Sequence, residues 1–132
     1  MNEVALVGRI TKDPMLREVA GGRLQATFVL AVSRNFKNSN GQTDTDFILC
    51  TLWNKLAEST AKYCGKGSLI GLAGRIQSRT YEREDGSRVY VTEVIGEKVH
   101  FITTKPPLSQ TSQEQSQNEH FHMPQDEQLP IT

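Results

Sequence analysis

The sequence has no long apolar run, only two cysteines and no basic residue after Lys105. Because a membrane-spanning helix needs about 20 apolar residues in succession, no such helix is expected. Residues 1–4 also lack the basic-then-apolar pattern of a secretory signal. Cys50 and Cys64 cannot make a disulfide framework and are expected to pack as small apolar groups. These absences favour a reduced, cytoplasmic protein without membrane contact.

The sequence also lacks the residues of a catalytic or metal centre. His100 is the only histidine before residue 106, so no set of nucleophile, base and orienting group can be assembled around it. His120 and His122 follow in a segment expected to be disordered, where two imidazoles cannot close a metal coordination sphere. We therefore expect no enzymatic activity, no bound metal and no cofactor.

The charges are divided unevenly along the chain. The formal net charge is zero, but residues 1–105 hold 15 basic and 11 acidic residues, whereas residues 106–132 hold four acidic and no basic ones. A basic body with an acidic tail is typical of proteins that contact nucleic acid. The tail is rich in Gln, Ser and Pro and too polar to bury a core. We therefore predict a folded domain over residues 1–105 and a disordered tail over residues 106–132.

The body has the pattern of an all-β fold. Apolar and polar residues alternate over residues 26–33, which is typical of a strand with one buried face. Further strands are expected at residues 4–7, 45–53, 68–80, 89–95 and 98–103. Asp85 and Gly86 predict a tight hairpin turn before residues 89–95.

One segment, residues 54–65, predicts a short helix. Asn54 is a candidate N-cap, and Gly65 is a candidate left-handed C-terminal residue. Its apolar stripe of Leu56, Ala57, Thr60, Ala61 and Cys64 is expected to face the core. Strands on both sides of one helix favour a five-stranded oligonucleotide-binding (OB) barrel with the helix between its third and fourth strands.

Strand parity predicts a displayed aromatic surface. Over residues 47–53, the odd positions share one face and the even positions Ile48, Cys50 and Leu52 share the other, which suits a barrel interior. Phe47 and Trp53 then lie outward, about 20 Å apart along the strand. Phe28 alternates with core positions, and Phe101 is likewise expected in the core.

Two more aromatic residues stand among cations. Tyr81 shares a strand face with Arg75 and Arg79, and Phe36 is expected to begin the polar loop that follows Arg34 and Asn35. Flat rings flanked by cations suit a polymer that exposes bases and carries phosphates, which indicates single-stranded nucleic acid. Basic residues expected to contact phosphates are Arg34, Lys55, Lys66, Arg75, Arg79 and Arg88.

Several motifs occur in a fixed order over residues 1–103. They are NEVALVGRI at 2–10, DP at 13–14, TDF at 45–47, WNKLAE at 53–58, KGS at 66–68, GRI at 74–76 and VTEV at 91–94. Together they resemble the motifs of bacterial single-stranded DNA-binding proteins. In that family, rings that stack on DNA bases stand at the positions of Phe36, Phe47, Trp53 and Tyr81. The resemblance also implies a homotetramer of barrels around which single-stranded DNA wraps in replication, recombination, repair or DNA uptake.

The C-terminal tip departs from the family pattern. Family members usually end in several acids, Leu or Ile, Pro and a terminal Phe that docks replication and repair proteins. The matching residues are Asp126, Glu127, Leu129, Pro130 and Ile131. Ile131 replaces the aromatic residue and Thr132 extends beyond it, which predicts weaker docking or different partners.

Two other interpretations fit the residues. A barrel of this kind could bind RNA or duplex DNA, which competition with single-stranded DNA would distinguish. The exposed rings could instead belong to a protein interface between subunits. Replacing Trp53 and Phe36 would then break the oligomer rather than abolish nucleic-acid binding.

Overall fold

The computed structural model describes residues 1–108, and the expectations for the tail at residues 109–132 lie outside the described part. The elements are β1 (Val4–Ile10), β2 (Met15–Val19), the 3-10 turn η1 (Ala20–Gly22), β3 (Arg23–Lys37), β4 (Thr43–Trp53), α1 (Asn54–Tyr63), β5 (Leu69–Glu82) and β6 (Arg88–Thr103). Within residues 1–108, every helix is too short or too polar to cross a bilayer.

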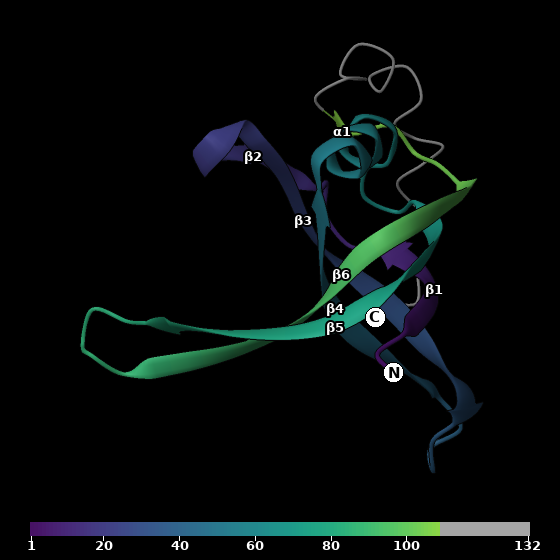
Figure 1. Cartoon of the computed structure of the whole chain (residues 1–132). Helices are drawn as coiled ribbons and strands as arrows, with labels where there is room; N and C mark the ends of the chain where they lie inside the picture. The colour runs from purple at the N-terminus through teal and green to yellow at the C-terminus, as the bar shows by residue number, and fades with distance from the viewer. Residues whose placement is uncertain (109–132) are drawn as a thin grey trace.

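Five of the six strands close into a barrel (Figure 1). The order runs β1-β5-β6-β4-β3, and β3 pairs back with β1 through Arg9 opposite Ala31 and Ile10 opposite Leu30. The pairs are antiparallel except for β4 with β6, which touch in parallel at Cys50–Val94 and Thr51–Ile95. Helix α1 follows the third barrel strand, β4, and precedes the fourth, β5, so the predicted OB-type barrel is confirmed.

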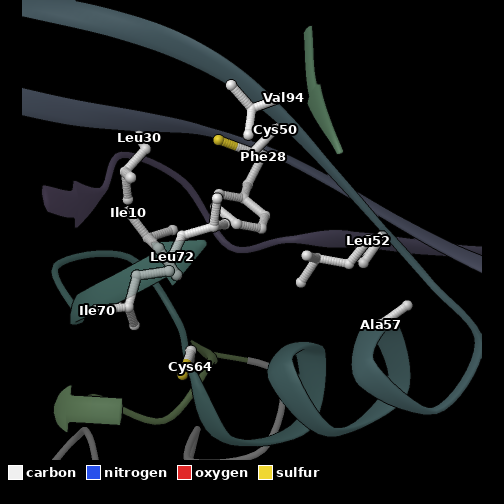
Figure 2. Packing of buried hydrophobic residues seen from close by; sticks show 11 residues of the cluster. Ile10, Phe28, Leu30, Cys50, Leu52, Ala57, Cys64, Ile70, Leu72 and Val94 are labelled. Carbon is white, nitrogen blue, oxygen red and sulfur yellow. The ribbon is translucent and has the colours of Figure 1, made fainter. Parts of the chain in front are cut away.

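The barrel interior is filled by the alternating residues of β3 and β4. Figure 2 shows Phe28 and Leu30 gathered with Cys50 and Leu52, and Ala57 of α1 beside them. All five are buried, as strand parity predicts for the four residues of β3 and β4 and the helical apolar stripe predicts for Ala57. Burial away from water disfavours a thiolate, raising the pKa of Cys50 to about 12.

Asp13 joins the segment after α1 to the residues that follow β6. Its carboxylate accepts hydrogen bonds from the backbone N–H of Lys66 at 2.8 Å and of Leu108 at 3.1 Å. Pro107 is buried, and a Cβ added to Gly65 would lie 2.7 Å from the Pro107 Cα. Gly65 is therefore required by close packing. The prediction that it adopts a left-handed conformation is wrong.

Three other local predictions are wrong. Asn54 does not cap α1 with its side chain; it is the first helical residue and has a φ of 56°. The two strands expected at 89–95 and 98–103 are one continuous strand, β6. Phe101 lies on the surface rather than in the core. Strand β2 was not expected, because it pairs with the edge of β3 through its backbone and shows no buried face.

Strands β5 and β6 extend beyond the barrel as a two-stranded arm (Figure 1). The turn at its tip is the predicted one: Gly86 has a φ of 89°, and the Ser87 N–H donates to the Asp85 carboxylate at 2.9 Å. At the base of the arm, Gly74 pairs with Gly96 beside an irregularity in the ladder. A Cβ on Gly74 would collide with the backbone carbonyl of Ile95. The glycine pair therefore lets the two strands cross closely where the barrel wall becomes the arm.

This crossing yields a stability prediction. We expect Gly74→Ala to destabilise the protein by roughly 1–3 kcal/mol, because the added methyl group meets backbone that cannot yield easily. Ser78→Ala, at an exposed position farther along the same strand, is the matched control. It removes a surface hydroxyl and adds nothing to the crowded crossing, so a change within about 0.5 kcal/mol is expected. Equal midpoints for the two variants in urea unfolding would contradict the close crossing.

Candidate nucleic-acid interface

The outer face of β4 carries two of the aromatic residues. The β3–β4 ladder sets Trp53 opposite Gln25, Thr51 opposite Thr27 and Phe47 opposite Ala31, and paired residues share a face. Phe47 is 54% exposed, whereas Trp53 is half-buried. Thr51 departs from the expected open face: it is only 2% exposed, because the base of the arm covers it.

A groove of about 390 Å³ lies at this end of the barrel. It is walled by the β2–β3 hairpin on one side and the arm on the other, with the end of β4 between them. The lining residues are Arg17, Val19, Ala20, Arg23, Gln25, Thr51, Trp53, Gln77, Arg79, Glu93 and Ile95. Three arginines and one carboxylate among these make the groove positive.

Glu93 fixes the arm wall of this groove. It is 4% exposed, and no other acidic or basic side chain within residues 1–108 is so buried. Its carboxylate accepts a hydrogen bond from Thr51 Oγ1 at 2.5 Å and one from Arg79 Nε at 2.7 Å. The side chain of Arg79 is nonetheless 52% exposed. Because a guanidinium has five donors, Arg79 can hold Glu93 and still offer N–H groups to a phosphate.

Trp53 is partly covered by a cation. The Arg23 Cζ lies 4.4 Å from the centroid of the Trp53 ring, which is a cation–π contact. Arg23 did not emerge from the sequence, because β3 was expected to begin at residue 26. With the register known, Arg23 is the diagonal neighbour of Trp53, two residues before its partner Gln25.

The arm carries Tyr81 on the face that leads into the groove. The register sets Gln77 opposite Glu93 and Tyr81 opposite Val89, so Arg79 and Tyr81 share the groove face. Tyr81 is 47% exposed. Arg88 lies opposite Glu82, on the other face of the arm.

Arg75 is the first arginine of the arm, and it already makes a hydrogen bond and an ion pair. Its Nη1 donates to Gln77 Oε1 at 2.7 Å, and its Nε lies 3.5 Å from the Glu97 carboxylate. A phosphate at Arg75 would therefore compete with an existing ion pair.

Phe36 and Arg34 lie in β3, near its hairpin turn to β4. The prediction that a loop begins at Phe36 is wrong, because β3 continues to Lys37. Phe36 is 68% exposed. Arg34 donates to the Asp46 carboxylate through Nη2 at 2.9 Å and Nε at 3.1 Å, and Asp44 lies 3.6 Å away. The hydrogen bond lowers the pKa of Asp46 and raises that of Arg34. The two carboxylates therefore offset the charge of Arg34, which weakens its attraction for a phosphate.

The two lysines of the predicted set lie at opposite ends of α1. Lys55 is exposed two residues after Trp53. Lys66 is exposed beyond the other end of the ten-residue helix, which is about 15 Å long. The structure thus brings Trp53 and Arg79 into one groove with Tyr81 along the arm, and it sets Lys66 apart.

Several residues named from the sequence belong to the part of the chain beyond residue 108. The tip residues Asp126, Glu127, Leu129, Pro130 and Ile131 lie outside the described residues, as do His120 and His122. Among residues 1–108, no three His, Cys, Asp or Glu side chains are grouped so as to hold a metal ion.

Comparisons with known proteins agree with this arrangement. The model of the single-strand binding protein family matches residues 1–102. The chain is 55% identical over 105 residues to single-stranded DNA-binding protein B of Bacillus subtilis, covering 80% of this chain and 93% of that protein. It is 52% identical over 110 residues to a single-stranded DNA-binding protein of Enterococcus faecalis, covering 83% of this chain and 58% of that one. With the closed barrel and the match over nearly all of it, the chain belongs to the single-strand binding protein family.

Proposed function

We propose that this protein binds and coats single-stranded DNA with little sequence preference. By doing so it would protect the strand and remove secondary structure during replication, recombination, repair or DNA uptake. The observation that carries the proposal is the display of Phe36, Phe47 and Tyr81 on the surface, with Trp53 in a groove lined by arginines. The names of the similar proteins support the same activity.

The chemistry of the surface explains the weak sequence preference. Every base has a flat face, so stacking on a ring contributes about 1–3 kcal/mol whichever base is bound. Phosphate contacts from arginines and lysines are equally indifferent to sequence. Four rings would together outweigh any single hydrogen bond to a base edge. The expectation that the chain is not an enzyme is confirmed by its family, whose members bind DNA.

The same surface should also distinguish single-stranded DNA from duplex DNA and from RNA to different degrees. A duplex hides its base faces, so the four rings gain nothing from it. RNA offers similar stacking, and competition between oligo(dT), its RNA counterpart and duplex DNA would rank the three. The chain is proposed to work in the cytoplasm beside the chromosome, where single-stranded DNA arises.

A second proposal concerns assembly. Ala5 and Val7 are exposed on the outer face of β1, opposite Ala73 and Gly71 of β5, so the shared face is small and apolar. A flat face of this kind suits a second copy of the chain. The homotetramer implied by the family resemblance is proposed to use it, and Phe101 and Ile102 are further exposed apolar residues on β6.

The tail proposals rest on sequence alone. Residues 106–132 carry four acidic and no basic residues, so they would compete weakly with DNA for the groove. The tip from Asp126 to Ile131 is proposed to dock replication or repair proteins with altered strength or choice of partner.

The stacking proposal predicts graded losses from single rings. We expect Phe36→Ala and Phe47→Ala each to weaken binding to oligo(dT) by about 5- to 150-fold, the equivalent of one lost stack. Tyr63→Ala is the matched control, because Tyr63 is an exposed ring at the far end of α1 that packs with Phe101. Fluorescence anisotropy with a labelled oligonucleotide measures all three. An equal loss in the Tyr63 variant would contradict the assignment of the site.

The phosphate proposal predicts a salt dependence. Emission from Trp53, the sole tryptophan, should be quenched as oligo(dT) is added. The logarithm of the binding constant should fall linearly with the logarithm of salt, by about 0.7 for each phosphate contact. Binding that does not change with salt would show that the arginines and lysines make no such contacts.

The assembly proposal predicts that one charge added to the exposed face of β1 should weaken the oligomer. Val7→Glu should reduce the molar mass found by light scattering, because burying a carboxylate between two copies costs several kcal/mol of desolvation free energy. Met15→Glu, on strand β2, places the same charge on another exposed apolar residue and should leave the mass unchanged. Retention of the wild-type mass in Val7→Glu would exclude the β1 face as the contact.

A further inference from the structure

The contact between Arg23 and Trp53 occupies the place where a base would stack. The guanidinium carbon lies 4.4 Å from the ring centroid, which leaves no room for a flat base between them. This contact is on the groove side, since both residues line the groove. A base can therefore reach this face of Trp53 only if Arg23 moves.

Arg23 is also free to move. It is exposed at the first residue of β3, and within residues 1–108 no carboxylate lies within salt-bridge distance of it. Arg17, on the same wall, differs because its Nε donates to Gln25 Oε1 at 2.8 Å. The one carboxylate lining the groove, Glu93, is taken by Thr51 and Arg79.

We propose that Arg23 is a displaceable cover on Trp53 and a phosphate-binding residue of the occupied groove. In the free protein its guanidinium shields the ring. When a base stacks on Trp53, Arg23 turns to a phosphate of the same strand, the only anion then within the groove that is not already paired. This inference rests on the proposed binding of single-stranded DNA.

The relative strengths of the two contacts favour replacement of the Arg23 guanidinium by a base on Trp53. An exposed cation–π contact is worth about a two- to fivefold change in an equilibrium constant, whereas a base stack is worth about 5- to 150-fold. The base therefore displaces the guanidinium, and the new phosphate contact adds to the gain at low salt. At high salt the phosphate contact is screened, and the cost of uncovering Trp53 remains.

The test compares wild type with Arg23→Ala over a range of salt concentrations, using oligo(dT) of fixed length. The variant lacks one phosphate contact, so its log–log salt slope should be shallower by about 0.7. It also has no cover to displace. At about 1 M salt it should bind about two- to fivefold more tightly than wild type, and the two curves should converge or cross as salt falls.

Two further measurements separate this role from simple packing. Arg23→Lys keeps the charge and should keep the wild-type salt slope. Without DNA, Arg23→Ala should change the emission spectrum of Trp53, and Lys12→Ala, which removes an exposed cation outside the groove lining, should not.

The outcomes are distinct. If wild type binds oligo(dT) and Arg23→Ala binds more weakly at every salt concentration with an unchanged slope, the role given to Arg23 is wrong. An unchanged tryptophan spectrum in that variant would also show that Arg23 does not cover Trp53 in the free protein. If wild type itself fails to bind oligo(dT), the proposed function fails, and the spectrum of the free variant still decides whether Arg23 shields the ring.

Discussion

The groove depends on one buried carboxylate. A charge held almost entirely away from water is costly unless every oxygen is satisfied, and Glu93 meets that condition through Thr51 and Arg79. Strands β4 and β6 are otherwise joined at only two parallel register pairs. The hydrogen bond from Thr51 to Glu93 therefore reinforces one of the two shortest pairings between neighbouring strands of the barrel, the other being β1 with β3. The same carboxylate holds Arg79, so the stability of the arm base and the charge of the groove have a common origin.

The outward and inward faces of β4 were predictable because side chains alternate strictly along a strand. Cys50 and Leu52 had to share one face, and Phe47 had to take the other. Burial of Thr51 was not predictable, since it results from its contact with Glu93 of β6 rather than from the pattern within β4. The contact between Arg23 and Trp53 was hidden for a similar reason. Predicting this contact requires the β3–β4 register at Arg23. The alternation covers only residues 26–33 and does not reach that position.

The errors at the helix ends and in β6 come from packing that local signals do not contain. Gly65 has the residue type of a helix terminator, yet its small size is needed by Pro107, which returns from the end of β6. Gly96 reads as a break between two strands. In the barrel it permits one continuous strand, because the side chains of Leu52 and Leu72 occupy the space where its Cβ would stand. In both cases a distant segment determines the role of the glycine.

The position of Arg79 affects the path that a bound nucleic-acid strand could take across the surface. Phe47 lies near the middle of β4 and Trp53 at its end, about 20 Å apart on one face, and Thr51 lies between them, hydrogen-bonded to Glu93. A nucleic-acid strand that touches both rings must therefore cross the base of the arm. That crossing point presents the half-exposed guanidinium of Arg79 instead of a ring. The surface thus alternates ring, cation and ring along one path, which matches a polymer that alternates bases and phosphates.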